Sequence, residues 1–219
     1  FLQSGALFDA ATAFAPSVQG ADTASTWNLG FSLYGMKTLP LEEALRTCAQ
    51  IGYRNVELAL MPGYPTDPAR FDREARRVAR GLIEEKGLGI SALMVNLSLS
   101  VDDVKHRTHL ETLQFAAESA HDLAATPPPI ETVLGGKPAE WEKIKEQMVE
   151  RLQDWAAVLQ KAGATLALKA HVGSAVNSPE RLLWLLDQVK SPALVVAYDY
   201  SHFELQGIEM ETSIQQLLP

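Results

Sequence analysis

Segments typical of strands and segments typical of helices alternate along this 219-residue chain, from about residue 28 to its end. Strands are predicted at 28–36, 55–61, 88–97, 130–136, 165–171 and 193–200, and helices at 39–53, 69–86, 101–124, 139–162, 179–189 and from 210 onward. One strand and one helix recur about every 30 to 40 residues, a spacing that indicates parallel strands joined by crossover helices. The chain is therefore predicted to fold around a parallel sheet covered by helices.

Two architectures have this alternation, an open doubly wound sheet and a closed eight-unit barrel. In three of the predicted strands, one face carries large apolar side chains and the other carries small or polar ones; Val56 and Leu58, for example, alternate with Glu57 and Ala59. Such strands suit a barrel whose helices pack outside and whose polar strand ends point into a common mouth. The first strand is not followed by Gly-x-Gly-x-x-Gly, which argues against a dinucleotide-binding sheet. We predict a (β/α)8 barrel, with about six of its units present.

Composition limits the classes of function. The chain is 47% hydrophobic, which is enough for one full-sized core, and its net charge of −8 provides no basic footprint for nucleic acid or an anionic membrane. The single cysteine, Cys48, excludes an internal disulfide and is expected in the core. The histidines at 106, 109 and 121 and the arginines of 73–80, "REARRVAR", are expected at the surface.

Residues 1–26 differ from the rest, being rich in Ala and Ser and free of Lys and Arg. They resemble the later part of a twin-arginine export signal, so export to the periplasm is expected; a cytoplasmic location follows if they are only a leader. The segment is too diluted in apolar residues for a membrane span. Residues 27–219 are assigned to the barrel.

Polar groups occur where the predicted strands end. Within "LALKAHV", Lys169 and His171 share one strand face. The remaining candidates are Glu57, Asn96, Asp199 and His202. Because the carboxyl ends of barrel strands converge, these side chains are expected to meet at one mouth and to bind a small molecule there. The alternative for Glu57 and Asn96 is a structural role in capping or turns.

Four segments together resemble one known family. "GYRNVEL", "LGGKPAEW", "LALKAHVGSAVNSPERLLWLLDQV" and "YDYSHFEL" follow one another in the order and at the spacing found in the sugar phosphate isomerases and epimerases, the xylose isomerase-like TIM barrels. The resemblance covers about 190 residues, from Asn28 to the end. It implies a divalent metal (Mn, Mg or Zn), held by a glutamate, an aspartate, a histidine and a second glutamate from strands five to eight. The two glutamates of that family move a proton at the carbon beside a carbonyl.

Carried over to this sequence, the resemblance makes Asp199 the strand-six metal ligand and His202 the histidine that holds substrate oxygen. Lys169 stands where the strand-five glutamate belongs. An ammonium group cannot ligate a cation, so this departure removes one ligand and one acid–base group. The predicted strands seven and eight are not in the sequence, so a metal is in doubt.

Three roles for Lys169 remain open. Its charge could replace the metal and stabilise an enediolate, the amine could act as a base or form a Schiff base, or it could form a structural salt bridge with Asp199. The function predicted is isomerisation or epimerisation of a carbohydrate, with Lys169 and His202 catalytic and His171, His202, Glu57 and Asn96 binding substrate. The alternatives are a lyase or dehydratase acting on a keto-sugar or inositol-like ring, and a non-catalytic exported carbohydrate-binding barrel. Homo-oligomerisation is left open. The related DNA-repair endonuclease barrels are disfavoured by the acidic charge balance.

Overall fold

The computed structural model describes residues 28–218 of the protein. The strands are β1 (Gly30–Ser32), β2 (Asn55–Ala59), β3 (Gly89–Met94), β4 (Ile130–Val133), β5 (Leu166–Lys169) and β6 (Leu194–Ala197). The α-helices are α1 (Leu41–Ile51), α2 (Arg73–Glu85), α3 (Asp103–Leu123), α4 (Trp141–Ala162), α5 (Pro179–Val189), α6 (Tyr200–Glu204) and α7 (Met210–Leu217), and the 3-10 helices are η1 (Leu33–Met36) and η2 (Pro138–Glu140). The predicted leader, 1–26, lies outside the described residues.

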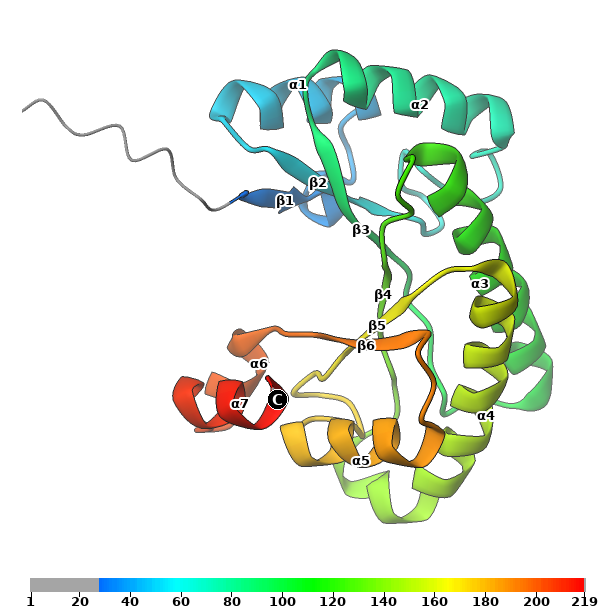
Figure 1. Ribbon diagram of the computed structural model, residues 1–219, viewed down its shortest axis with the longest axis vertical. Coiled ribbons are helices and arrows are strands. Elements are labelled where there is room, and N and C mark those ends of the chain that lie inside the picture. Colours follow the sequence, from blue (N-terminus) through cyan, green and yellow to red (C-terminus); the bar gives the residue numbers. More distant parts are fainter. Residues whose placement is uncertain (1–27, 219) are drawn as a thin grey trace, which may run out of the picture.

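The order of the strands in the sheet settles the architecture. All pairings are parallel, and each strand pairs with the one before it, from β1 to β6. A doubly wound sheet would reverse its strand order near the middle, whereas a barrel adds each strand on the same side. Helices α1 to α5 follow the outside of the curved sheet, and β1 and β6 lie at its two ends (Figure 1). The protein therefore has six βα units of a (β/α)8 barrel, as the sequence predicts.

The main core lies between the sheet and the outer helices. Leu58, Leu93 and Leu168 point outward from β2, β3 and β5 and are fully buried. Trp155 of α4 is fully buried in the same layer, as is Cys48 of α1, which confirms the predicted core thiol. Because one face of every strand is committed to this apolar layer, the alternate residues must face the inside of the barrel.

The first and last strands are shorter than predicted. The segment 28–36 ends as a strand at Ser32, whose hydroxyl accepts a hydrogen bond from the Tyr34 amide at 3.3 Å and starts η1. The segment 193–200 ends as a strand at Ala197, and Asp199 then caps α6, a helix that the sequence did not predict. Both changes turn the chain at the carboxyl end of a strand, where a barrel places its site.

Two predictions of surface exposure are wrong. His106 and His109 are buried between α3 and its neighbours, with His106 Nε2 2.9 Å from the Asp154 carboxylate and His109 Nδ1 3.1 Å from the Ser98 carbonyl. These histidines occupy buried positions of α3 that apolar side chains usually fill. Their burial could not be predicted from the polar sequence of the helix. His121 is exposed, as predicted.

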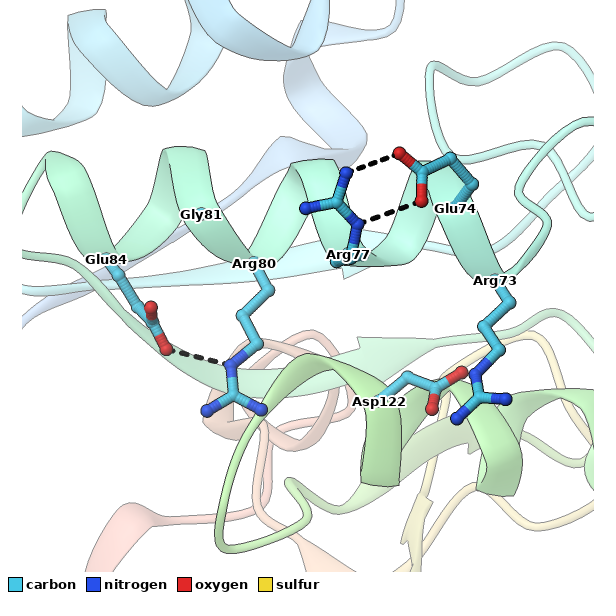
Figure 2. A pocket seen from close by; sticks show the side chains of 7 residues that line it. All are labelled: Arg73, Glu74, Arg77, Arg80, Gly81, Glu84 and Asp122. Atoms are coloured by element: carbon cyan, nitrogen blue, oxygen red, sulfur yellow. Dashed lines mark hydrogen bonds and ion pairs between the residues drawn. The ribbon is translucent and has the colours of Figure 1, made fainter.

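The arginines of α2 divide between surface and interior. Within α2, Arg77 forms two hydrogen bonds with Glu74, and Arg80 forms one with Glu84, and these residues line a solvent-facing hollow of about 790 Å³ (Figure 2). These pairs stand on the exposed helix face that the sequence predicts. Arg76, however, is buried and pairs with Asp122 of α3 at 2.8 Å, so it joins two helices.

Candidate active site

A buried ion pair forms on the inner face of the sheet. Glu131 of β4 lies opposite Ala167 of β5, and Lys169 is two residues further along the same face of β5. The small Ala167 side chain leaves room for Lys169 to reach back, and Lys169 Nζ lies 3.1 Å from Glu131 Oε1. The sequence reasoning missed Glu131. The signal was present, because a lone acidic residue interrupts "IETV" just as the lysine interrupts "LALK".

The Glu131 carboxyl has an unusual environment. Its side chain is only 6% exposed, and among residues 28–218 neither carboxyl oxygen has a hydrogen-bond partner, so the Lys169 ion pair through Oε1 is the polar contact of this group. Burial raises its pKa, the charges of Glu57 and Asp199 add to the rise, and the Lys169 ammonium only partly opposes it. A carboxylate whose conjugate acid has a raised pKa is a stronger base than an ordinary carboxylate.

Glu57 reaches the inner face from β2. Ser32 of β1 lies opposite it in register, and the Ser32 hydroxyl donates a 2.5 Å hydrogen bond to Glu57 Oε1. This bond fixes one carboxylate oxygen and leaves the other toward the barrel interior. Glu57 is thus held in place by a neighbouring strand, and it lines the same hollow as Glu131 and Lys169.

Asp199 and His202 come from the turn after β6. Asp199 Oδ1 accepts hydrogen bonds from the Ser201 hydroxyl at 2.6 Å and from the Ser201 amide at 3.2 Å, while its Oδ2 lies 3.6 Å from His202 Nε2. Burial would raise the pKa of Asp199, but the Ser201 hydrogen bonds and the charges of His202 and Lys169 outweigh it, so the pKa is lowered. Asp199 is therefore a fixed anion at the mouth.

His171 and His202 face each other. Their ring centroids are 4.1 Å apart, although His171 follows β5 and His202 lies in α6. The Gly173 amide donates a 3.0 Å hydrogen bond to His171 Nδ1, so in the neutral ring the hydrogen must be on Nε2. Burial, together with the charges of His202 and Lys169, lowers the His171 pKa. His171 can therefore present a neutral N–H donor.

Two hollows meet at Lys169. The first, here called the inner cleft, has a volume of about 360 Å³ and is lined by Tyr34, Met61, Met94, Val95, Asn96, Val133, Lys169, His171 and His202. The second, the acidic cleft, has about 550 Å³ and is lined by Glu57, Glu131, Lys169, Ala197, Tyr198, Asp199, Tyr200 and Ser201. The ammonium group thus separates a pocket of imidazole and apolar groups from a pocket of carboxylates.

These hollows bring together all six residues predicted from sequence. Lys169, His171, His202 and Asn96 line the inner cleft, while Glu57 and Asp199 line the acidic cleft. The predicted partner of Lys169 is wrong. Its ion pair is with Glu131 of the neighbouring strand, whereas the Asp199 carboxylate accepts hydrogen bonds from Ser201 and forms its ion pair with His202.

The geometry does not fit a divalent-metal site built from this part of the chain. Among residues 28–218, no three His, Cys, Asp or Glu side chains lie close enough together to hold a metal ion. One oxygen of Asp199 is occupied as a helix cap, and the cation nearest to Glu131 is Lys169. A protonated amine has no lone pair for a metal, so the described donor set departs from the one that the resemblance implies.

No helix in the described range 28–218 has both the length and the apolar content needed to cross a bilayer.

Comparison with solved structures shows the same fold at low identity. The probable 3-DHS dehydratase AsbF involved in petrobactin synthesis from Bacillus anthracis aligns with a TM-score of 0.73 and 20% identity, over 87% of this chain and 69% of that one. The IolI protein with a bound zinc atom aligns with a TM-score of 0.70 and 18% identity, over 85% of this chain and 67% of that one. A xylose isomerase-like TIM barrel protein from Mycobacterium smegmatis in complex with magnesium aligns with a TM-score of 0.68 and 16% identity, over 90% of this chain and 73% of that one.

The protein spans between about two thirds and three quarters of the length of these three structures. No curated protein matches the sequence. The sequence profile described as xylose isomerase-like TIM barrel matches residues 45–216, which include the strands from β2 to β6 and the polar groups of both clefts. Together with the sequential parallel sheet, this match shows that the chain belongs to the xylose isomerase-like TIM barrel family.

Proposed function

We propose that the protein is a carbohydrate isomerase or epimerase that moves a proton at the carbon beside a carbonyl group. The observation that carries the proposal is the buried pair of Glu131 and Lys169 at the junction of the two clefts. The pair combines a carboxyl of raised pKa with a fixed positive charge. Proton removal beside a carbonyl needs both a base and a group that stabilises the resulting oxyanion.

The residues divide the reaction between them. Glu131 takes the proton, so the C–H bond breaks as a carboxyl O–H bond forms, and the electron pair moves to the carbonyl oxygen as an enediolate. Lys169 stabilises that oxyanion by its charge. Glu131, whose acidic proton can exchange with solvent, then returns a proton to the neighbouring carbon while the hydroxyl proton passes from one substrate oxygen to the other, which isomerises the sugar. Epimerisation at the original carbon instead needs a second acid that delivers a proton to the opposite face. No external oxidant or metal enters these steps.

The imidazoles hold the substrate in position. His171 offers an Nε2 hydrogen to a substrate oxygen, since its Nδ1 accepts from Gly173. His202 lines the same cleft, and Asp199 at 3.6 Å orients its ring. Asn96 adds an amide at the opposite wall. Hydroxyl groups of a sugar match these donors and acceptors, and a non-reacting polyol would be bound in the same way.

A second candidate is a lyase or dehydratase on a keto-sugar or inositol-like ring. It shares the first proton abstraction, and the structural neighbour described as a probable dehydratase favours it. The difference is that a hydroxyl leaves the intermediate, with His202 or His171 supplying its proton. A dehydratase would release water and form a product of altered mass, whereas an isomerase keeps the mass unchanged.

Proton exchange tests the proposal directly. The full-length protein is incubated in D₂O with a panel of ketoses and aldoses, and deuterium at the carbon beside the carbonyl is measured by NMR and mass spectrometry. We expect exchange with at least one sugar and a decrease of about 10²- to 10⁴-fold in Glu131→Gln. Glu111→Gln, which changes an exposed glutamate of α3, is the matched control.

The alternatives give different results in the same experiment. Loss of 18 mass units with deuterium incorporation would identify the dehydratase. Sugar binding without exchange would leave a non-catalytic carbohydrate-binding barrel. Borohydride reduction in the presence of substrate separates the roles of the amine, because a labelled Lys169 would mean a Schiff base and would overturn the electrostatic role proposed here.

A further inference from the structure

A third hollow, here called the outer cleft, adjoins the inner cleft on the side away from Lys169. It has a volume of about 490 Å³ and shares three lining residues with the inner cleft, Tyr34, Met61 and Asn96. Ligand clefts in proteins generally have about 300 to 1,000 Å³, so each of the two is ligand-sized by itself. Because they share these residues, the two clefts are immediate neighbours.

One wall of the outer cleft is a face of α3. Lys105, Thr108 and Thr112 line it, and they lie on one helix face because they are three, four and seven residues apart. The Thr108 and Thr112 hydroxyls donate hydrogen bonds to carbonyls of the preceding helix turn, which leaves their oxygens able to accept from a ligand. This wall therefore offers two hydroxyl acceptors and one ammonium donor.

The facing wall is the loop between β2 and α2, which is held rigidly. The Thr66 hydroxyl donates a 2.8 Å hydrogen bond to the Ala59 carbonyl. The Asp67 carboxylate accepts from the Gly63 amide at 2.7 Å and from the Ala69 amide at 3.0 Å. A loop fixed at both ends in this way forms a preorganised wall, so a ligand would not have to order it on binding.

The two clefts meet at an exposed aromatic ring. Tyr34 stacks on Tyr64 with ring centroids 5.7 Å apart and an interplanar angle of 23°, and Lys37 covers Tyr64 with Nζ 4.9 Å from its centroid. Tyr64 is 8% exposed, whereas Tyr34 is 54% exposed. The free face of Tyr34 is apolar and flat, and the C–H face of a pyranose ring would cover it.

The charges of the two compartments differ. The acidic cleft carries three carboxylates, while no Asp or Glu lines the outer cleft in the described part of the chain. The outer cleft instead combines hydroxyl, amide and aromatic groups with the Lys105 ammonium and the His109 imidazole. The hydroxyl groups of a sugar can form hydrogen bonds with each of these polar groups.

From these observations we infer that the substrate is a two-ring carbohydrate, with the reacting ring at Lys169, where the inner and acidic clefts meet, and a second sugar ring in the outer cleft. The inference rests on the proposed function for the identity of the reacting ring. It adds that the substrate is a glycosylated sugar, because a monosaccharide would fill only one of the two joined compartments. Thr108 would contact the second ring. Asn96 and Tyr34, which line both clefts, would contact the linkage between the two rings.

Calorimetric titration of the full-length protein tests the second ring. The ligands are D-fructose and D-glucose, together with disaccharides that carry one of them as the reducing unit: turanose, lactulose, palatinose, maltose and cellobiose. We expect at least one disaccharide to bind ten times more tightly than its own monosaccharide. Thr108→Tyr, which puts a ring into the outer cleft, should remove that advantage. Glu111→Tyr puts the same ring on an exposed part of α3 outside the cleft and should keep it.

Each result separates this inference from the proposed function. If no disaccharide binds more tightly than its monosaccharide, or if Thr108→Tyr does not reduce that difference in affinity, the second-ring site is overturned. This holds even where monosaccharides exchange protons in D₂O. An advantage that depends on Thr108 without any proton exchange supports the second-ring site and overturns the proposed reaction. Glu131→Gln should keep the advantage while losing exchange, since Glu131 does not line the outer cleft.

Discussion

Lys169 Nζ and Glu131 Oε1 lie 3.1 Å apart on neighbouring strands, with their side chains 16% and 6% exposed. Complementary charges on two adjacent strands are placed side by side by the register of the sheet, in which Val133 is opposite Lys169 and Glu131 is opposite Ala167. Burying such a pair does not by itself stabilise a fold, because desolvation of both groups offsets their attraction. Its position at the junction of two clefts is what gives it a proposed chemical role.

Lys169→Met should destabilise the protein in a pH-dependent way. Burial raises the Glu131 pKa above its unfolded value of 4.5, so ionising this carboxyl costs folding free energy as pH rises, and the ammonium reduces the cost. Without the ammonium this cost increases and should reach about 3 kcal/mol at pH values above the folded-state pKa of Glu131. The cost vanishes below pH 4.5, where the carboxyl is protonated in both the folded and the unfolded state.

Urea denaturation of wild type and variant at pH 5 and pH 8 measures this difference. The loss of stability should be larger at pH 8, and the double variant Lys169→Met with Glu131→Gln should recover most of it. A loss of equal size at both pH values would mean that Lys169 stabilises the fold by packing alone.

Proton exchange should be insensitive to chelators in the wild type and should acquire metal dependence in Lys169→Glu. The wild-type cation is part of the protein, whereas the variant adds a fourth carboxylate to Glu57, Glu131 and Asp199 in the acidic cleft, and carboxylate oxygens are ligands for Mn²⁺ and Mg²⁺. Mn²⁺ binding is measured by calorimetry, with Lys169→Met as the matched control that removes the charge without adding a ligand. Tight, stoichiometric metal in the wild type that Asp199→Asn abolishes would contradict the internal-cation role.

The His171 imidazole should titrate below its ordinary pKa of about 6.5. Burial and the neighbouring His202 and Lys169 charges disfavour the imidazolium, whereas the Asp199 charge favours it. Asp199→Asn should therefore move the His171 pKa further down. Imidazole chemical shifts followed by NMR from pH 4 to 8 measure it, and Asp187→Asn, on the exposed face of α5, is the control. An upward shift in Asp199→Asn would show that the Asp199 charge does not act on this ring.

The two kinds of α2 arginine should differ in their contribution to stability. Asp122→Asn leaves the buried Arg76 guanidinium without its anion, although Arg76 keeps its hydrogen bond to the Phe71 carbonyl, and we expect a loss of about 1 to 3 kcal/mol. Arg77→Met removes an exposed pair and should change stability much less than Asp122→Asn, because solvent screens the charges. Thermal and urea unfolding compare the two variants, and equal losses would mean that Arg76 and Asp122 do not form a buried connection between α2 and α3.

The sequence alone was enough for the class of fold and for the polar residues at the carboxyl ends of the strands, where the structure forms the inner and acidic clefts. Strand and helix periods are local properties of the chain, so their alternation, the buried Cys48 and the polar strand ends were all readable before any coordinates. The ends of β1 and β6 could not be predicted from the sequence, because the turns that end these strands depend on Ser32 and Asp199 acting as helix caps.

Only the tertiary structure decided which of the polar groups are partners. From the sequence, a salt bridge between Lys169 and Asp199 was one of three open roles for the lysine. In the structure Lys169 pairs with Glu131, because the register of β4 and β5 places Glu131 opposite Ala167, two residues before Lys169 on the same face. Register depends on how two strands about 35 residues apart pack against a common layer of helices. The outer cleft likewise exists because α3 and the loop after β2 lie side by side. Contacts between distant segments are set by packing of the whole fold, which no local pattern in the chain encodes.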